Sequence, residues 1–325
     1  METEATPRSS ELSPKRSGTQ PPPSLASMAQ SATQGREEAS RSVRLRTAWP
    51  RLQRLCPPRS GRIWLVGGAP GNFKTQMVLN LALDMASLHQ RVLFVTLEQT
   101  AGEIGMQALA RYSGVSVERL DLAFGRENLQ LTADEDARVA DASARFADLE
   151  LYLRIHGAER NGSSLEAVLH SATRSRFDAI FLDHLGMVDR GRGSELDAIP
   201  RTANALRVLA RGATSSGYTP FVCVTTPLSR KRDEDDHPKL SHLRGSGNLE
   251  YDADFVMVVQ KREQPEESDA PNVVDGFVLK NRQGRCPLVM QFEAQGAISR
   301  VVERHTSDTS PTQHWQDREP GSDDD

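Results

Sequence analysis

Short, almost uninterrupted apolar runs alternate along most of this chain with segments of helical spacing. A strand that is exposed on one face alternates apolar and polar residues, whereas a strand that is covered on both faces reads as a continuous apolar run. The runs here are of the second kind. The pattern therefore predicts an α/β fold, in which helices cover both faces of a mostly parallel sheet. The runs are 62–68, 91–98, 178–183, 220–226 and 254–260.

The segments between and after these runs complete the expected order of elements. Residues 151–156 read as a further strand, and residues 273–284 and 287–294 read as a hairpin-like pair. No internal repeat is visible in the sequence. Helical spacing predicts helices over 75–88, 101–115, 134–149, 164–174 and 195–214.

Both ends of the chain are polar. Residues 1–43 are rich in Ser and Pro, and residues 304–325 form an acidic stretch that ends in GSDDD. Such segments bury too little apolar surface to offset the entropy lost on ordering, so we expect both to be disordered. The residues between them, 44–303, are then expected to form one α/β domain.

The composition argues against several classes of protein. A net charge of -4 does not by itself indicate a nucleic-acid partner. The sequence has no apolar run of about 18 residues or more and no apolar segment near its N-terminus, so we expect a cytoplasmic protein without a membrane span or secretory signal. Cys56, Cys223 and Cys286 are scattered, which argues against a disulfide framework or a cysteine metal site.

The stretch GAPGNFKT follows the first apolar run and opens the first predicted helix. It matches the phosphate-binding pattern G-x-x-x-x-G-K-[ST], except that Phe73 stands where the second glycine is expected. In such loops backbone N–H groups surround the phosphates, the lysine contacts the β- and γ-phosphates, and the hydroxyl binds Mg²⁺. The alternative is a glycine turn that happens to precede Lys-Thr. The candidate nucleotide-binding residues are Gly68, Ala69, Pro70, Gly71, Asn72, Phe73, Lys74 and Thr75.

Two carboxylates end apolar runs. Asp183 closes DAIFLD, where an acid on the Mg²⁺ side is expected, and Glu98 closes VLFVTLE, where a carboxylate can polarise a water molecule. Ligands of open α/β sheets bind at the carboxyl ends of the strands, which is where both residues are expected. For each residue the alternative is a strand-end charge that faces solvent.

LRGSGNLEYDADFVMVV (243–259) resembles the pattern L-R-x-S-G-x-I-E-x-D-A-D that precedes an apolar strand in DnaB-type replicative helicases. VLKNRQG (278–284) is similar to the K-x-R-x-G that follows it in that family. VLFVTLEQ (92–99) resembles the strand that ends in the family's catalytic glutamate, and FLDHLGMV (181–188) resembles its D-Y-L-x-L-M. The resemblance covers about residues 47–303 and implies a P-loop NTPase core, namely the RecA-like motor domain of superfamily 4.

The resemblance implies an enzyme that hydrolyses ATP with Mg²⁺. By position, Lys74 and Thr75 would hold phosphate and Mg²⁺. Glu98 would be the general base, and Asp183 would organise Mg²⁺ through water.

The resemblance further implies that Lys280 and Arg282 reach into the site of a neighbouring subunit as a charge clamp and an arginine finger. Two cations at positions i and i+2 of a strand point to one side and can stabilise charge on a γ-phosphoryl group. The alternative is a solvated strand face. A finger that acts on a neighbour implies a homo-oligomeric ring, a hexamer in this family.

Single-stranded DNA would then contact loops that face the channel of the ring. The candidate loops are 189–195 and 229–247. The acidic run 233–236 would repel the DNA backbone, so a solvated loop of mixed charge is the alternative. The candidate DNA-binding residues are Arg230, Lys231, Arg232, Lys239 and Arg244.

Three departures from the family pattern bear on turnover. If the position of Phe73 needs a positive φ, its side chain costs about 1–3 kcal/mol, and Phe73→Gly is expected to raise the ATPase rate or affinity. Thr226 takes the place, in our alignment, of the glutamine that senses the γ-phosphate in the family. The family's N-terminal helical domain has no counterpart in residues 1–43, so we expect a replication partner protein, another oligomer or a monomer.

The sequence therefore predicts an ATP-dependent DNA helicase or translocase motor of the DnaB-like class, acting on single-stranded DNA in replication. Two alternatives stay open. One is a RecA-like ATPase with a recombination or regulatory role. The other is a nucleotide-binding scaffold that does not hydrolyse ATP, which Phe73 and Thr226 favour.

Overall fold

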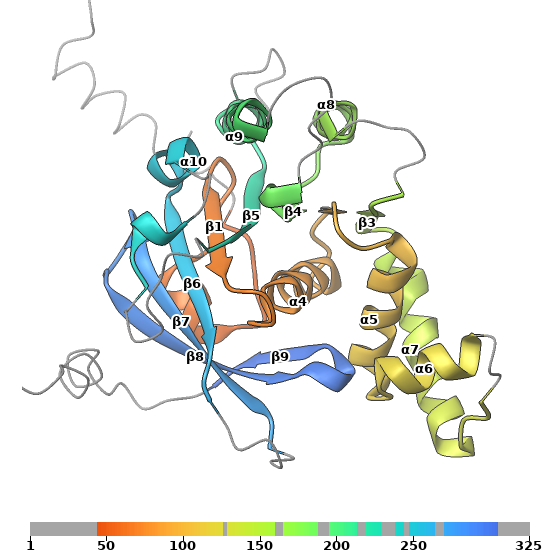
Figure 1. The fold of residues 1–325 in the computed structure, drawn as a ribbon. Helices are drawn as coiled ribbons and strands as arrows, with labels where there is room; N and C mark the ends of the chain where they lie inside the picture. The colour runs from red at the N-terminus through yellow and green to blue at the C-terminus, as the bar shows by residue number, and fades with distance from the viewer. Residues whose placement is uncertain are drawn as a thin grey trace, which may run out of the picture. The chain divides into compact units, whose positions relative to one another are not determined.

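The computed structural model describes residues 44–125, 129–159, 165–187, 195–212, 219–228, 238–243, 247–263 and 270–304. These residues form a nine-stranded sheet in the order β3-β2-β4-β5-β1-β6-β7-β8-β9 (Figure 1). The strands are β1 Ile63–Gly68, β2 Val92–Thr96, β3 Leu153–His156, β4 Ala179–Asp183, β5 Phe221–Pro227, β6 Phe255–Lys261, β7 Asn272–Asn281, β8 Leu288–Gln295 and β9 Arg300–Glu303.

The sheet has a parallel part and an antiparallel part. The strands from β3 to β6 in this order pair in parallel, and β7, β8 and β9 extend the sheet as antiparallel strands. Every residue of β1, β2 and β4 is buried, whereas buried and half-buried residues alternate along β8. The continuous apolar runs thus lie in the part that is covered on both faces, and the prediction of a mostly parallel sheet is confirmed.

Helices cover both faces of the parallel part (Figure 1). One buried cluster joins the sheet to α4 and α5, and a second joins its other face to α8, α9 and α10. The helices are α3 Pro50–Leu55, α4 Lys74–Ser87, α5 Ala101–Ser113, α6 Val117–Phe124, α7 Ala133–Leu149, α8 Leu165–Ser175, α9 Glu195–Ala210 and α10 Gly247–Asp252.

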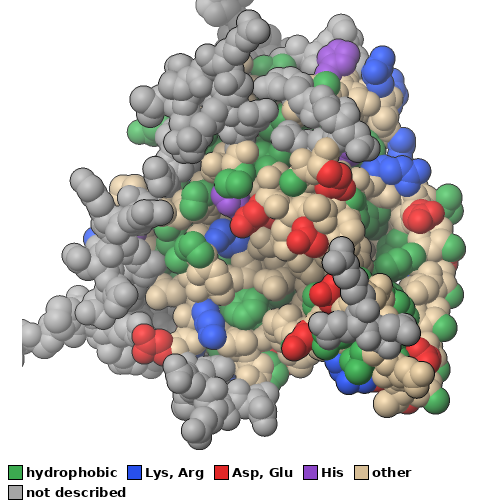
Figure 2. Space-filling view, turned by 45° about the vertical axis from the view of Figure 1, so that its right-hand side comes forward, with side chains coloured by type: hydrophobic (Ala, Val, Ile, Leu, Met, Phe, Trp, Pro, Cys, Tyr) green, Lys and Arg blue, Asp and Glu red, His purple; other side chains and the backbone are tan. Residues whose placement is uncertain are grey.

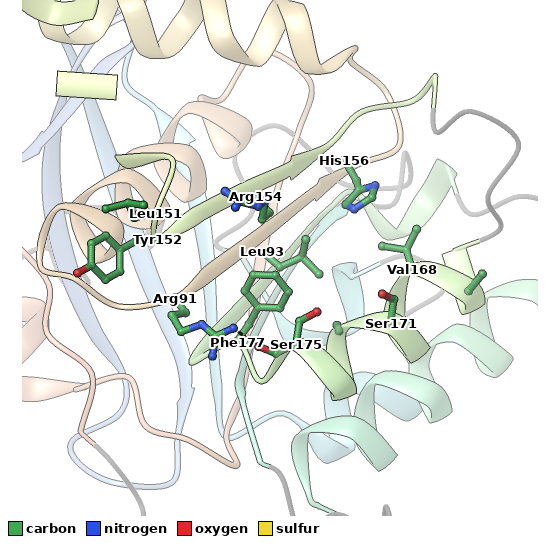
Figure 3. Close-up of a pocket in the computed structure, with 12 residues that line it drawn as sticks. Arg91, Leu93, Leu151, Tyr152, Arg154, His156, Val168, Ser171, Ser175 and Phe177 are labelled. Carbon is green, nitrogen blue, oxygen red and sulfur yellow. Dashed lines mark hydrogen bonds between the residues drawn. The ribbon is translucent and has the colours of Figure 1, made fainter. Parts of the chain in front are cut away.

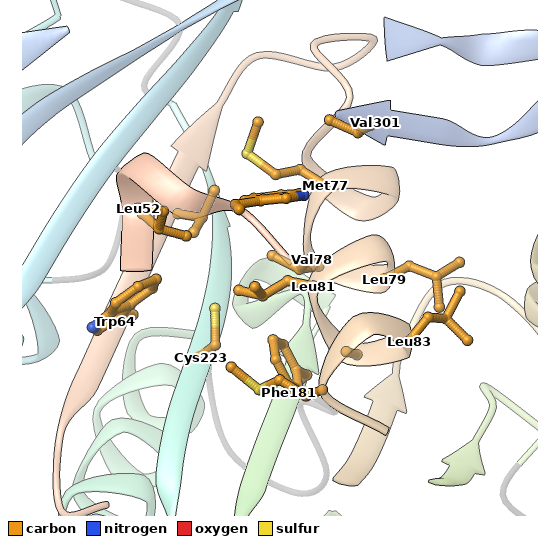
Figure 4. Close-up of a cluster of buried hydrophobic side chains, with 14 of the residues drawn as sticks. Leu52, Trp64, Met77, Val78, Leu79, Leu81, Leu83, Phe181, Cys223 and Val301 are labelled. Carbon is orange, nitrogen blue, oxygen red and sulfur yellow. The ribbon is translucent and has the colours of Figure 1, made fainter. Parts of the chain in front are cut away.

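The helix α4 is the centre of the first cluster, because it is buried at every residue from Met77 to Ala86. A helix that is covered on all sides needs partners on all sides. Figure 4 shows Val78 and Leu81 beside Phe181 and Cys223 of the sheet. β9 and α7 also lie against α4, and α5 contacts it through Arg111. The phosphate loop that precedes α4 is therefore anchored to the most buried helix of the fold.

The two buried polar residues of α4, Asn80 and Asp84, share a partner on α5. Arg111 Nε donates to Asn80 Oδ1 at 2.6 Å, and its other nitrogen pairs with the carboxylate of Asp84. Burial raises the pKa of Asp84, while the guanidinium of Arg111 opposes that shift. A buried charge of this kind is tolerated because it is paired and hydrogen-bonded.

Four short elements are absent from the sequence prediction, namely α3, α6, α10 and β9. β9 has only four residues and is held by pairing with β8. Its sequence is therefore too short to show the alternation of apolar and polar residues that predicts a strand. The predicted strand 91–98 in turn exceeds β2, which ends at Thr96. Leu97 and Glu98 leave the sheet in a turn, and this exit sets the position of the Glu98 side chain.

No helix in the described part of the chain is long and apolar enough to cross a membrane. The three thiols are free: Cys56 and Cys223 are buried, and Cys286 is exposed. Cys223 lies in the core, as its apolar surroundings in the sequence predict. Burial raises the pKa of Cys56 to about 12, so this thiol is a poor nucleophile at neutral pH.

Candidate nucleotide-binding site

The predicted phosphate loop connects the end of β1 to the start of α4. Gly68 is the last residue of β1, and Lys74 is the first of α4. A side chain at Gly68 would place its Cβ 2.9 Å from the carbonyl oxygen of Val259 and 3.0 Å from Lys74 Cγ, so only glycine fits. Because the loop ends at a helix N-terminus, unpaired backbone N–H groups and the positive end of the helix dipole lie at the same point.

Phe73 stands just before α4 in the left-handed conformation, with φ 60° and ψ 20°. Its position therefore has the positive φ that glycine normally supplies. The ring packs against the apolar cluster around α4 and lies close to Gly296, where an added Cβ would be 3.1 Å from Phe73 Cε1. Packing of the ring thus stabilises a backbone conformation that is unfavourable for phenylalanine.

Lys74 folds back over the loop that precedes it. Its Nζ donates to the carbonyl oxygen of Ala69 at 2.8 Å. Burial lowers the pKa of Lys74, and the carboxylates of Asp183 and Glu98 oppose this shift. The ammonium group therefore lies within electrostatic reach of both predicted acids and of the loop.

Asp183 is 1% exposed and accepts two hydroxyl hydrogen bonds. Thr75 Oγ1 donates to Oδ2 at 2.9 Å, and Thr225 Oγ1 donates to Oδ1 at 2.6 Å. Burial raises the pKa of Asp183, while the two hydroxyl donors oppose that shift. The first turn of α4 and the ends of β4 and β5 thus meet at this carboxylate.

Glu98 lies on a tight turn between β2 and α5. The N–H of Leu97 donates to the carbonyl oxygen of Asp183 at 2.6 Å, and the N–H of Gln99 donates to Thr96 Oγ1 at 3.1 Å. Thr100 then caps α5 in a reciprocal arrangement with Glu103. The backbone of Glu98 is fixed on both sides, while its side chain is 55% exposed beside the ring of His184.

The structure therefore brings Lys74, Thr75, Glu98 and Asp183 together at the carboxyl ends of parallel strands. We call this group of residues, with the phosphate loop, the phosphate end of the sheet. Sequence reasoning missed His184 as a member. The signal for it was a titratable residue directly after the strand-end acid Asp183.

The family model described as "DnaB-like helicase C terminal domain" matches residues 47–300 of this chain. The chain belongs to the DnaB-like helicase C-terminal domain family. The α/β prediction and the resemblance to DnaB-type replicative helicases are both confirmed.

Individual relatives agree with this assignment. A probable plasmid replicative DNA helicase from Chlamydia trachomatis is 28% identical over 231 residues, which are 69% of this chain and 47% of that protein. The chain thus spans about half the length of the curated relatives it matches.

Solved structures show the same fold. One of them, an ATPase domain, has a TM-score of 0.70 at 18% identity, and the match covers 87% of this chain and 99% of that domain. Another, a DnaB-like replicative helicase solved in a study of its interactions with primase, has a TM-score of 0.69 at 18% identity. That match covers 88% of this chain and 68% of the helicase.

In this DnaB-like domain, Lys280 and Arg282 lie at the opposite end of the strands from the phosphate loop. Lys280 pairs with Val256 and Asn281 with Phe255, at the level where β1 begins rather than where it ends. A shift of three residues along a strand is roughly 10 Å, and two strand spacings add about as much sideways. We call Lys280, Arg282 and the helix α10 beside them the finger end of the sheet.

Both cations of the finger end bind the last turn of α10. Lys280 Nζ donates to the carbonyl oxygens of Glu250 at 2.8 Å and Tyr251 at 3.0 Å. Arg282 Nη2 donates to the same Tyr251 oxygen at 2.7 Å, and Nη1 lies 3.8 Å from Asp254 Oδ1. The two side chains thus lie on one side, as their spacing predicts. Burial and the nearby Arg282 guanidinium lower the pKa of Lys280.

Thr225 and Thr226 face opposite sides of the sheet, because side chains alternate along a strand. Thr225 contacts Asp183, whereas Thr226 is buried next to Gly67 in the register of β1 and β5. Thr225 is thus the threonine of this strand whose hydroxyl binds Asp183.

Four of the predicted DNA-binding residues, Arg230, Lys231, Arg232 and Arg244, lie outside the described residues. Lys239 is exposed at the start of a short 3-10 turn, and its N–H donates to His242 Nδ1 at 3.2 Å. On the face seen in Figure 2, basic and acidic side chains of the described residues are interspersed. The DNA-binding residues therefore stay a prediction from the sequence.

The residues at the phosphate end fit a magnesium ion. The Thr75 hydroxyl and the Asp183 carboxylate are oxygen donors, and they lie 2.9 Å apart beside the phosphate loop. Among the described residues no group of three or more His, Cys, Asp or Glu could hold a metal. Mg²⁺ commonly keeps water and phosphate oxygens in its coordination sphere, so two protein oxygens next to a triphosphate are a sufficient set.

A cavity of 470 Å³ lies elsewhere, between α8 and the strands β2 and β3 (Figure 3). Its walls come from β2, β3, α8 and the residues just before β2, β3 and β4, with Arg91, Arg154 and His156 as the basic side chains. Arg91 donates to the carbonyl oxygen of Ser175 and lies over the ring of Phe177. The cavity shares no residue with the phosphate end.

Proposed function

We propose that this chain is the motor domain of a replicative DNA helicase or translocase, which hydrolyses ATP with Mg²⁺ and acts on single-stranded DNA. The observation that carries the proposal is the convergence of Lys74, Thr75, Glu98 and Asp183 around the N-terminus of α4. Membership of the DnaB-like family supports the same conclusion.

In the proposed reaction the backbone N–H groups of the loop and the Lys74 ammonium bind the triphosphate. The lysine exchanges its bond to the Ala69 carbonyl for a stronger, charge-assisted bond to phosphate. Thr75 and Asp183 would hold Mg²⁺, which supplies positive charge next to the β- and γ-phosphates. Glu98, on its fixed turn, takes a proton from the water that attacks the γ-phosphorus in line. The bond from the γ-phosphorus to the β–γ bridging oxygen breaks, so that ADP and phosphate are released.

The position of Lys280 and Arg282 supports a reaction shared between copies of the chain. At the far end of the strands these cations do not reach the γ-phosphate of their own subunit. A second copy that presents its finger end to the phosphate end of the first would complete the site. Such a head-to-tail contact closes into a ring, which we propose to be a hexamer around the DNA.

A replication partner is also part of the proposal. One neighbour in structure is a DnaB-like replicative helicase studied with primase. We propose that a replication protein likewise binds this motor. Arg230, Lys231, Arg232, Lys239 and Arg244 are the proposed contacts to single-stranded DNA.

Phosphate release with and without single-stranded DNA tests this function. Lys74→Ala should abolish nucleotide binding, whereas Glu98→Gln should keep binding and lower turnover by about 10²–10⁴-fold, because it removes the general base. Binding is measured with a fluorescent ATP analogue on the same samples. Equal rates for the wild type and Glu98→Gln would contradict the assignment of the base.

A second candidate is a nucleotide-binding scaffold without turnover, which the strained position of Phe73 favours. Tight ATP binding without phosphate release in any sample would support it. A RecA-like ATPase in recombination or regulation would instead show DNA-stimulated hydrolysis without strand unwinding.

A further inference from the structure

His184 directly follows Asp183 and lies against Glu98. Its Nε2 is 3.3 Å from Glu98 Oε2, and the side chains of the two residues are 18% and 55% exposed. The family pattern D-Y-L that this segment resembles has a tyrosine at the position of His184. The role of this imidazole therefore has to be argued from its contacts in this chain.

The contacts of the ring indicate which nitrogen carries the proton. The backbone N–H of Gly186 donates to His184 Nδ1 at 3.1 Å, so Nδ1 acts as an acceptor. In a neutral imidazole the other nitrogen is then the donor. Nε2 is then the nitrogen that carries the hydrogen, and it lies 3.3 Å from the Glu98 carboxylate, within reach of an electrostatic contact.

Packing holds the ring in this orientation. A Cβ added at Gly186 would lie 3.2 Å from His184 Nδ1, His184 Cε1 and Pro227 Cγ. The imidazole therefore lies against a turn in which a side chain at residue 186 would press on the ring. Its backbone neighbour Asp183 is fixed by Thr75 and Thr225. The ring of His184 is held by the Gly186 N–H and is 18% exposed, whereas the Glu98 side chain is 55% exposed.

We propose that His184 is a positioning residue for Glu98: its Nε2–H holds the carboxylate in the orientation in which it accepts a proton from the attacking water. An exposed glutamate has several rotamers, and only some point at the γ-phosphate. A rigid donor on one side of the carboxylate restricts that choice. The inference rests on the proposed ATPase function and extends it to a residue that does not touch the nucleotide.

The test compares His184→Phe with His184→Gln. The first keeps a planar ring and loses the donor, and the second returns an N–H donor at similar reach. His184→Phe should lower kcat by about 10–100-fold, as expected for a misplaced reacting group, with KM for ATP and the affinity for the fluorescent analogue unchanged. His184→Gln should restore a large part of kcat. His170→Phe, an exposed histidine on α8, is the matched control and should leave kcat unchanged.

Two further variants separate positioning from a structural role. Gly186→Ala keeps His184 but pushes a methyl group against its ring, and it should lower kcat without changing KM. In the Glu98→Gln background, His184→Phe should cause no further loss, because a residue that acts through Glu98 has nothing left to position. Melting temperatures of all variants show whether the fold is kept, and Gly186→Ala replaces His184→Phe as the variant that should lower kcat if the latter does not fold.

The outcomes distinguish this inference from the proposed function. Wild-type phosphate release that His184→Phe and Gly186→Ala both leave unchanged overturns the role of His184 and leaves the ATPase intact. The role of His184 is also overturned if His184→Phe changes KM rather than kcat. The same holds if its loss of kcat adds in full to the loss caused by Glu98→Gln. A wild-type chain that binds ATP but releases no phosphate overturns both.

Discussion

The phosphate end and the finger end of the sheet are built in different ways. At the phosphate end, side chains from several strand ends meet one another: Thr75 and Thr225 bind Asp183, and Glu98 lies beside His184. At the finger end, Lys280 and Arg282 bind backbone carbonyls of α10 instead of acidic side chains at a reaction centre. One end is a constellation of chemical groups, and the other is a pair of cations held by a short helix.

This difference indicates what each end can do within a single chain. The phosphate end has the parts needed to bind a nucleotide. The finger end has positive charge, and its hydrogen-bond partners are neutral carbonyl oxygens, with Asp254 at the longer distance of 3.8 Å from Arg282. A phosphate can replace such carbonyl partners with a stronger interaction. One subunit is thus expected to bind ATP by itself, whereas rapid hydrolysis of ATP is expected to need two subunits.

The strongest test of this difference between the two ends is Arg282→Ala. If Arg282 acts on a neighbour, phosphate release should fall by about 10³-fold or more while ATP binding stays intact, because arginine fingers contribute mainly to the transition state. Mixing Arg282→Ala with Lys74→Ala should restore part of the activity, since some interfaces then combine an intact phosphate end with an intact finger.

Arg285→Ala is the matched control for this experiment, because Arg285 is exposed in the same β7–β8 connection. It should leave the rate unchanged. Arg282→Ala that retains full activity, or a mixture no more active than its components, would show that the finger end does not serve a neighbouring site.

Asp254 gives the largest expected effect on stability, and it lies at the finger end. Its carboxylate is 1% exposed and accepts from Arg62 at 2.9 Å, from Arg211 at 3.0 Å and from the N–H of Ile63 at 3.0 Å. Asp254→Ala leaves these donors without their acceptor and should reduce the free energy of unfolding by about 3 kcal/mol. Urea denaturation measures it, with Asp254→Asn expected to lose less. A loss below about 1 kcal/mol would mean that the cluster is no stronger than a surface ion pair.

Thr225→Val tests the phosphate end by replacing one hydroxyl group with a methyl group of similar size. It leaves Asp183 Oδ1 without the hydroxyl that donates to it at 2.6 Å, and the free energy of unfolding should fall by about 1–2 kcal/mol. A less firmly held carboxylate should also raise the Mg²⁺ concentration needed for half-maximal phosphate release. Thr226→Val, the adjacent buried threonine on the opposite face, should not change the Mg²⁺ requirement. An equal shift in both variants would contradict a specific role of Thr225.

The same two ends show how far the sequence could predict this molecule. The α/β class and the phosphate end were predictable, because continuous apolar runs define strands and because residues 68–75 form a local motif. The acids Glu98 and Asp183 were predictable because parallel strands bring their carboxyl ends to one side of a sheet. These inferences need only short stretches of sequence and one rule of topology.

The remaining features depend on contacts between distant segments, and no local pattern encodes them. The bonds from Lys280 and Arg282 to α10 join segments about thirty residues apart through backbone carbonyls, which every residue has. The contact of His184 with Glu98 depends on how β2 ends, two residues earlier than its apolar run. Thr225 and Thr226 have the same side chain, and only the pleat of β5 decides which one meets Asp183.

Phe73→Gly is the change with the smallest expected effect. From the contacts of the ring we expect it to act on the free energy of unfolding rather than on the affinity for ATP. The substitution removes a left-handed phenylalanine, which should stabilise the fold by about 1 kcal/mol or more. It also removes the contact of the ring with Gly296 and the α4 cluster, which costs a similar amount if roughly 50 Å² of apolar surface is exposed. The two terms oppose each other, so the free energy of unfolding should change by no more than about 1 kcal/mol.

Phe73→Asn separates the two terms. Asparagine tolerates the left-handed conformation but does not replace the ring, so this variant should be less stable than Phe73→Gly in the same urea titration. ATP affinity should differ from the wild type by less than about three-fold in both, because Phe73 contributes backbone shape and packing rather than a group that binds phosphate. Loss of ATP binding in Phe73→Gly would show that the ring holds the loop in its binding shape, and the phosphate end would then depend on packing from β8 and β9 as much as on its own residues.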